Sequence, residues 1–154
     1  MNISFFVPGI PAPGGSKNVF PRKGGGGYVV VDAGKGNAQW KRSVATVAKK
    51  YMAENKRKPF EKGKALYLYL DFYVKRPQSH FTSKGVLKKN APSYPTSKPD
   101  ECKLRRSTED ALTGICWYDD AQVVRCISEK NYCLFRTETS TYTNPGVSVL
   151  IVEM

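Results

Sequence analysis

The ten residues from Ala65 to Val74, ALYLYLDFYV, constrain the fold more than any other stretch of the chain. Leucines and Phe72 alternate with tyrosines and Asp71, which is the two-residue period of a β-strand. This alternation predicts a central strand with one apolar face and one aromatic, polar face. The tyrosines could stack on nucleic-acid bases, but packing under helices is the interpretation that we favour.

Two other segments have the period of an α-helix. The first runs from Asn37 to about Tyr51 and has an apolar stripe that begins at Trp40. The second follows Asp100, which could cap it, and Gly114 is a natural stop. Both patterns indicate helices with one buried side, as expected for helices that pack on a sheet.

Further short strands are expected where β-branched and aromatic residues cluster, at residues 2–7, 28–31, 122–129, 132–137 and 146–152. We expect residues 28–31 to pair with the first strand as a hairpin, and Asn131 to form a turn or an irregularity. Residues 75–99 carry several prolines and predict a long basic loop. The predicted fold class is α+β: a single domain over residues 1–154, with two principal helices packed on a mixed β-sheet.

The chain is strongly basic, with 25 Lys and Arg against 13 Asp and Glu and a net charge of +12. This balance makes a polyanion the expected partner, although a solvated basic surface is the simpler alternative. The candidate DNA-binding cations lie in loops and on the wet side of the first helix: Lys17, Arg22, Lys23, Lys41, Arg42, Lys75, Arg76, Lys88 and Lys89.

The cysteines argue against a zinc site. None of the four is spaced as C-x-x-C, and the one histidine, His80, is far from them in sequence. Reduced thiols in a cytoplasmic protein are expected. The first residues lack the pattern of a signal peptide, and no apolar run is long enough for a membrane helix.

Residues 98–124, KPDECKLRRSTEDALTGICWYDDAQVV, gather acids in a basic chain. Carboxylates that fix Mg²⁺, or Mn²⁺ in its place, beside cations that bind phosphate would suit phosphodiester cleavage. The candidate ligands are Asp100, Asp110 and Asp120, and Lys103 and Arg106 would stabilise the developing negative charge. A purely structural interpretation is also open, in which Asp100 caps the helix, Asp110 pairs with Arg106 and the Asp119-Asp120 pair forms a turn.

The motifs K-P-D-x-x-K-L-x-R, D-A-L-T-G and W-Y-D-D-A-Q-V-V in this segment resemble the core signature of the RusA family. These are small, dimeric, Mg²⁺-dependent endonucleases, often encoded by phages or prophages, that resolve four-way (Holliday) junctions. The resemblance implies a homodimer that nicks branched DNA symmetrically, metal ligands at Asp100 and Asp120, and a catalytic basic residue at Arg106.

One position departs from the family pattern. The second family carboxylate is replaced by Cys102, and a thiol is a poor ligand for Mg²⁺. Either Glu101 turns inward or Asp110 completes the site from the helix. A third possibility is a protein that binds branched DNA without cutting it, and a weaker one is a single-strand-binding module that uses the tyrosines.

Overall fold

The computed structural model describes residues 1–15, 17–32, 34–133 and 144–154, and its centre is a mixed sheet of four strands. These strands are β1 (Asn2–Pro8), β4 (Leu66–Val74), β5 (Val123–Tyr132) and β6 (Gly146–Glu153), in the order β1-β6-β4-β5. β4 pairs in parallel with β5 and antiparallel with β6, which also pairs antiparallel with β1. The predicted α+β class is confirmed.

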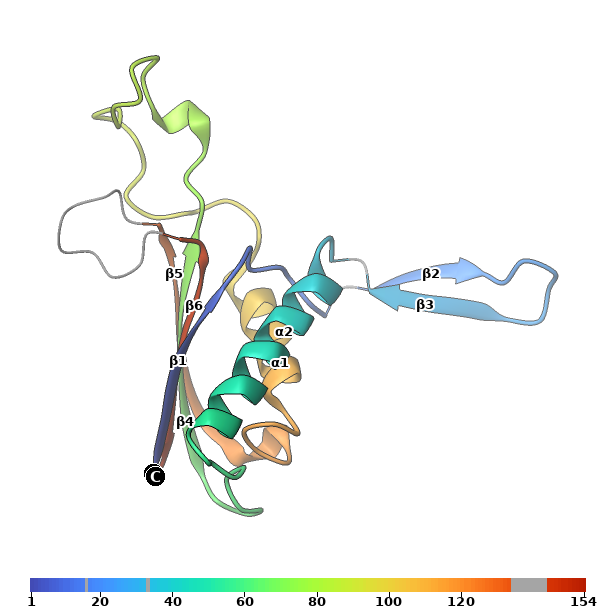
Figure 1. The fold of residues 1–154 in the computed structure, drawn as a ribbon. Coiled ribbons are helices and arrows are strands. Elements are labelled where there is room, and N and C mark those ends of the chain that lie inside the picture. Colours follow the sequence, from blue (N-terminus) through green and yellow to red (C-terminus); the bar gives the residue numbers. More distant parts are fainter. Residues whose placement is uncertain (16, 33, 134–143) are drawn as a thin grey trace.

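The alternation in β4 places its apolar residues in the core, as predicted. Leu66, Leu68, Leu70 and Phe72 are fully buried and belong to one hydrophobic cluster with residues of both helices. The helices α1 (Asn37–Glu54) and α2 (Glu101–Leu112) cover the same face of the sheet (Figure 1). The core therefore lies between two layers, one of strands and one of helices.

The tyrosines of β4 do not pack under the helices, so that prediction was wrong. Successive side chains of a strand point to opposite faces, and the helices cover the face that carries the leucines. Tyr67 and Tyr69 lie on the other face and are half-buried. There the Arg125 guanidinium lies 5.3 Å from the centre of the Tyr67 ring.

The strand predicted at residues 28–31 forms but has a different partner. β3 (Tyr28–Asp32) pairs antiparallel with β2 (Lys17–Pro21) in a separate two-stranded sheet, which projects from the body of the protein (Figure 1). β1 instead pairs with β6 from Asn2 to Pro8. The loop between β2 and β3 includes residues 24–27, four glycines that all have φ between 83° and 123°. Other residues adopt such angles only with strain, so this sharp return needs glycine.

The second half of the chain shows one further difference from expectation. β5 runs through Asn131 without a turn, because the Asn131 side chain donates a 2.7 Å hydrogen bond to Asp71 on β4 and stays in register. The strand predicted at 132–137 lies largely outside the described residues. Residues 75–99 are irregular, as predicted, apart from a short 3-10 turn from Gln78 to His80. Within the described ranges, no helix has the length and apolar character that crossing a membrane requires.

Candidate active site

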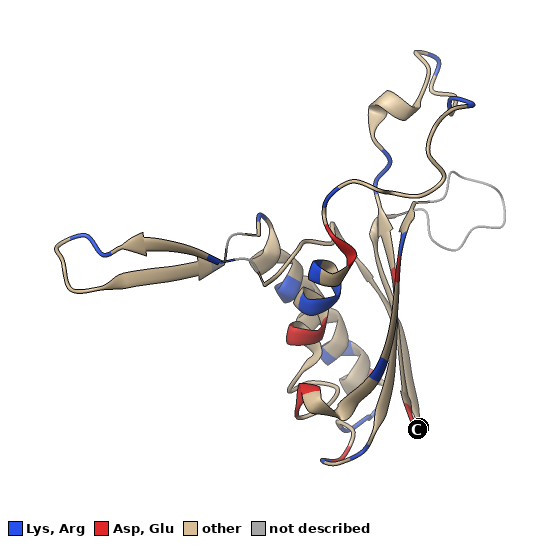
Figure 2. Cartoon of the chain, turned by 180° about the vertical axis from the view of Figure 1, so that it is seen from behind, with Lys and Arg blue, Asp and Glu red and all other residues tan. Residues whose placement is uncertain are grey.

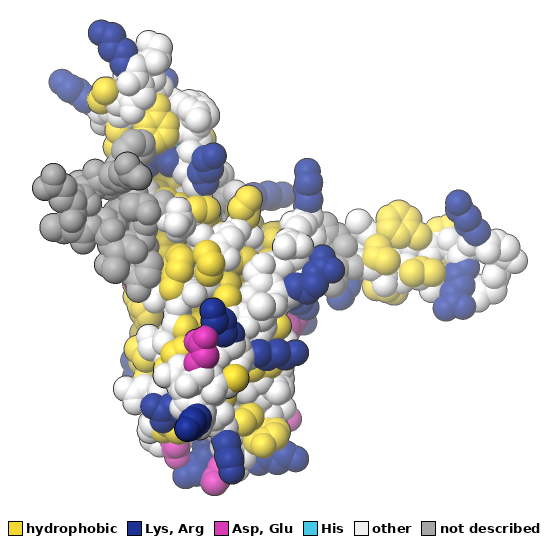
Figure 3. All heavy atoms as spheres, in the orientation of Figure 1, with side chains coloured by type: hydrophobic (Ala, Val, Ile, Leu, Met, Phe, Trp, Pro, Cys, Tyr) yellow, Lys and Arg dark blue, Asp and Glu magenta, His cyan; other side chains and the backbone are white. Residues whose placement is uncertain are grey.

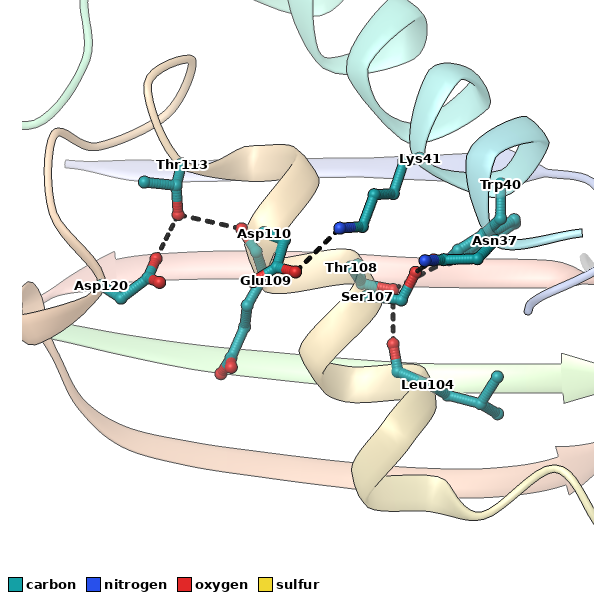
Figure 4. A network of polar contacts seen from close by, with 10 residues as sticks. All are labelled: Asn37, Trp40, Lys41, Leu104, Ser107, Thr108, Glu109, Asp110, Thr113 and Asp120. Atoms are coloured by element: carbon teal, nitrogen blue, oxygen red, sulfur yellow. Dashed lines mark hydrogen bonds and ion pairs between the residues drawn. The ribbon is translucent and has the colours of Figure 1, made fainter. Parts of the chain in front are cut away.

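The helix α2 is fastened to α1 by buried polar contacts. The Trp40 indole N–H donates to the Thr108 hydroxyl at 3.1 Å, and the Ser107 hydroxyl donates to the Asn37 side-chain oxygen at 2.5 Å. Thr108 in turn donates to the Leu104 carbonyl at 2.9 Å (Figure 4). Buried hydrogen bonds of this kind fix the rotation of a helix about its axis. The exposed side of α2 therefore presents its charged residues in a defined direction.

The Asp119-Asp120 pair forms a turn in which the two carboxylates have different roles. Asp119 caps a short 3-10 helix, because its carboxylate accepts from the Ala121 N–H at 2.9 Å. The buried Gln122 side chain accepts from the Tyr118 N–H at 2.9 Å and donates to the Glu61 carbonyl at 2.8 Å. Asp119 is thus used for structure, as expected, and Asp120 is left to face outward.

Asp120 points toward the end of α2. The Thr113 hydroxyl donates to its carboxylate and also lies 3.0 Å from the Glu109 carbonyl (Figure 4). A hydroxyl has one proton, so it can serve only one of these acceptors at a time. The rest of the Asp120 carboxylate is exposed and remains able to bind a cation.

A polar cavity of about 470 Å³ lies over the exposed side of α2. Three carboxylates, from Glu109, Asp110 and Asp120, line it. The cations Lys103, Arg105 and Arg106 also line it. The remaining lining comes from Gly14 and Gly15, in the loop after β1, and from the thiol of Cys102. The structure therefore brings together four of the candidate catalytic and metal-binding residues. These are Lys103, Arg106, Asp110 and Asp120.

Asp100 does not join this cluster within one chain. It precedes the first residue of α2, whereas Asp120 contacts Thr113, which follows the last one. A helix of 12 residues is about 18 Å long, and ligands of one Mg²⁺ ion lie within about 2 Å of it. Among the described residues, no group of three or more His, Cys, Asp or Glu side chains is placed to hold a metal ion. The expected shared site of Asp100, Asp110 and Asp120 is thus not formed inside a single chain.

Asp100 occupies the capping position of α2, but its side chain makes no capping hydrogen bond. It lies 3.6 Å from the Lys103 ammonium, is 47% exposed, and lines a second, more apolar cavity of about 770 Å³. Pro11 and Trp40 are among the residues around it. Lys103 lines both cavities and so lies between the two carboxylate positions.

Asp110 pairs with a different helix from the one expected. Its carboxylate accepts from the Lys41 ammonium of α1 at 2.8 Å, whereas the helical spacing favoured Arg106 (Figure 4). Because α1 and α2 pack side by side, Lys41 reaches across the interface. Lys41 was a candidate DNA-binding residue, and here it neutralises a carboxylate of the cavity.

Glu109 is a member of the cavity that sequence reasoning missed. Burial raises the pKa of its carboxyl, Arg105 opposes this rise, and the nearby Asp120 and Asp110 add to it. Carboxylates close enough to repel one another are a favourable environment for a cation. Its neighbour on β5 is Cys126, whose pKa burial raises to about 11. A signal existed in the sequence, since Glu109 lies three residues after the candidate Arg106, on the same helical side.

Cys102, at the position that departs from the expected pattern, is exposed and lines the cavity that contains Asp120. Its alternative, Glu101, accepts a hydrogen bond from the Ser128 hydroxyl on β5. Glu101 therefore turns toward the sheet, away from Asp120. The chemistry of the remaining donors, carboxylate oxygens, suits a hard divalent cation such as Mg²⁺ or Mn²⁺.

The candidate DNA-binding cations differ in their contacts and in their exposure. Some are held by the protein itself: the Arg76 guanidinium donates to the Pro92 carbonyl at 2.6 Å and stacks 4.1 Å from the Tyr132 ring centre, and Lys88 donates to the Ser79 carbonyl at 2.9 Å. They organise the loop after β4. Exposed candidates lie on the β2–β3 hairpin, on α1 and in that loop (Figure 2): Lys17, Arg22, Lys23, Arg42, Lys75, Lys88 and Lys89.

Gln122→Ala should destabilise the protein and weaken any chemistry that depends on Asp120. The substitution leaves the Tyr118 and Asp119 N–H groups and the Glu61 carbonyl without their buried partner. The expected loss is about 2–3 kcal/mol of unfolding free energy, measured by urea denaturation. Gln78→Ala, at an exposed position, is the control and should change stability by less than about 0.5 kcal/mol. Equal stability of the two variants would show that the Gln122 contacts do not hold the turn.

Comparison with known proteins adds one finding to this geometry. A family model described as Endodeoxyribonuclease RusA matches residues 10–151. No curated protein gives a significant match. The match includes α1, α2, the cavity over α2 and the turn that carries Asp120.

Proposed function

Because the chain belongs to the RusA family of endodeoxyribonucleases, which resolve Holliday junctions, we propose that it cuts four-way DNA junctions by a Mg²⁺-dependent reaction centred on Asp120. The observation that carries this proposal is the cavity in which Glu109, Asp110 and Asp120 lie beside Lys103, Arg105 and Arg106. Metal-dependent cleavage of a phosphodiester needs two components, which are carboxylates that hold a metal ion and cationic side chains that hold a phosphate.

Each side chain of the cavity has a distinct part in this proposal. The carboxylates of Asp120 and Glu109 would hold the divalent cation, which when bound would supply positive charge for the phosphoryl group and an activated water. Arg106 and Lys103 bind the phosphate and stabilise the charge that develops on it. Lys41 of α1 holds Asp110 by an ion pair of 2.8 Å, so Asp110 is the weaker candidate ligand.

The placement of Asp100 and Asp120 at opposite ends of α2 supports a site shared between two copies of the chain. If two copies place their α2 helices side by side and antiparallel, Asp100 of one copy approaches Asp120 of the other. A two-fold axis then creates two equivalent sites, which symmetric nicking of two strands requires. Asp100 and Asp120 are both exposed in the single chain and so are available to a second copy.

The edge of the sheet next to α2 is suited to such a contact. β5 is the outer strand, and its residues Val124 and Ile127 are 61% and 36% exposed. An exposed edge strand with apolar side chains is prone to pair with another chain. Two copies joined along β5 would bring their α2 helices together on one face, which is the arrangement proposed above.

The direct test incubates the protein with a mobile four-way junction and a matching linear duplex, with Mg²⁺ and with EDTA. Paired symmetric nicks in the junction alone, and with Mg²⁺ alone, are the expected result. Tight junction binding without cleavage, in Mg²⁺ or in Mn²⁺, would favour a non-catalytic junction-binding protein. It would also implicate Cys102 as the cause.

Cys102→Asp should strengthen metal binding, because it adds a carboxylate to the cavity that contains Asp120. We expect the Mg²⁺ concentration for half-maximal cleavage to fall about tenfold. Titration of cleavage rate against Mg²⁺ measures it, with Cys102→Ser as the control of similar size. An unchanged Mg²⁺ dependence would mean that this side chain does not face the metal.

A further inference from the structure

The hairpin of β2 and β3 exposes large apolar side chains on both of its faces. Val19, Phe20, Tyr28, Val29, Val30 and Val31 are all at least 41% exposed, and Tyr28 reaches 71%. Figure 3 shows these side chains along the projecting arm, with Lys and Arg at its far end. A two-stranded hairpin is only marginally stable in water on its own. A surface of this kind is normally covered by a ligand or partner.

The register of the hairpin places its two aromatic rings on opposite faces. Phe20 pairs with Val29, and Pro21 pairs with Tyr28. Directly opposed residues share a face and successive residues alternate, so Phe20 and Tyr28 point in opposite directions next to the turn. The end of the arm is therefore a thin ribbon with an aromatic ring on each side, and Phe20 is 52% exposed.

Charge identifies the kind of partner. Arg22 and Lys23 lie in the loop between the two strands, directly beside the aromatic pair, and both are exposed. Cations beside exposed aromatic rings suit a nucleic acid, because phosphates meet the cations while bases stack on the rings. A second copy of this chain would have to leave these charges unpaired or supply acids, which are scarce in a chain of net charge +12.

The length and the side chains of the hairpin favour contact with the flat faces of nucleic-acid bases over contact with their edges. Five residues of strand extend about 17 Å. Reading base edges in a groove requires hydrogen-bonding side chains, whereas Phe20, Pro21 and Tyr28 offer mainly apolar surface. Apolar wedges instead separate stacked bases and hold them apart. The centre of a four-way junction is where stacking is most easily interrupted.

We propose that the β2–β3 hairpin is a wedge that enters the centre of the junction, with Phe20 and Tyr28 each stacking on an unpaired base while Arg22 and Lys23 bind the adjacent phosphates. This role rests on the proposed function, since it assumes junction DNA as the substrate. It makes the hairpin a determinant of junction preference, separate from the cavity over α2 that performs the cutting.

The test uses an immobile four-way junction with 2-aminopurine next to the branch point, and a linear duplex with 2-aminopurine in the same sequence. Both are titrated with protein carrying Asp120→Asn, so that no strand is cut. The parent protein should raise 2-aminopurine emission in the junction. Phe20→Ala with Tyr28→Ala should remove most of that rise and weaken junction binding by about tenfold or more. Duplex binding should change by less than about twofold.

Two matched variants separate stacking from general damage. Phe20→Trp with Tyr28→Trp keeps a flat ring on each face and should restore emission and junction binding. Val31→Thr, a substitution of similar shape at an exposed position of the same hairpin, should behave as the parent does. Failure of the tryptophan variant to restore binding would contradict base stacking.

Other outcomes would overturn the inference outright. If the alanine double variant keeps the emission change and the junction preference, the rings do not enter the junction. If it loses its dimeric state in analytical ultracentrifugation, the hairpin covers a second copy of the chain instead. A parent protein with no preference for the junction would also refute the wedge. Wild-type protein could instead open the junction in a way that depends on Phe20 and Tyr28 but never cut it in Mg²⁺. That result would uphold the wedge and refute only the proposed metal-dependent cleavage.

Discussion

Asp120→Asn should reduce junction cleavage by about 10³-fold or more and leave junction binding unchanged or tighter. The amide cannot bind a divalent cation as a carboxylate does, so the reaction loses its charge stabilisation. Binding is preserved because the substitution also removes a negative charge that faces phosphate. Cleavage of a labelled junction under single-turnover conditions, with binding measured separately in Ca²⁺, gives both quantities.

The matched control is Asp119→Asn. Asp119 is the sequence neighbour of Asp120 and has the same carboxylate, but it caps the turn by accepting a hydrogen bond from the Ala121 N–H. An asparagine oxygen can accept that bond equally well. This variant should keep cleavage within about tenfold of wild type. If Asp120→Asn cuts as fast as wild type, Asp120 is not a metal ligand. If both variants fail alike, the turn as a whole is what matters.

Mixing two inactive variants should restore cleavage if the site is shared between copies. Asp100→Asn and Asp120→Asn homodimers each lack one ligand at both sites. In a mixed dimer with shared sites, one site carries both substitutions and the other carries neither. A statistical mixture is half mixed dimers, each with one intact site, so nicking should recover to about a quarter of the wild-type rate.

The experiment has a strict control in the double variant. Asp100→Asn mixed with Asp100→Asn, Asp120→Asn contains no intact site in any pairing and should stay inactive. The mixed dimers should also nick one strand per binding event where wild type nicks two. No recovery after unfolding and refolding the two variants together would contradict a site made from Asp100 of one copy and Asp120 of the other.

Sequence patterns predicted best the helices and strands whose apolar residues recur with the period of the element and are buried on one face. The leucines of β4 and the apolar stripe of α1 are buried as expected, because each element has one face that is clearly more apolar. The pairing of β3 was missed because its partner, residues 17–21, was not predicted as a strand. β1 pairs instead with β6, more than a hundred residues later in the chain.

The candidate site was predicted in its residue types and only partly in its arrangement. The turn at Asp120 and the charged side of α2 follow from the motif itself. The ion pair of Lys41 with Asp110 depends on how two helices pack, which no spacing within one helix reveals. The separation of Asp100 from Asp120 was available in principle, since a helix of 12 residues between them implies it.

The strand order also determines when the fold can form during synthesis. β6 lies between β1 and β4, although it is the last of the strands to leave the ribosome. Until it inserts, β1 has no partner in the sheet and one edge of β4 is open, so the two halves of the sheet stay separate. Pairings so distant in sequence also make folding slow. A chain interrupted before β6 would therefore lack the strand that joins β1 to β4 and β5.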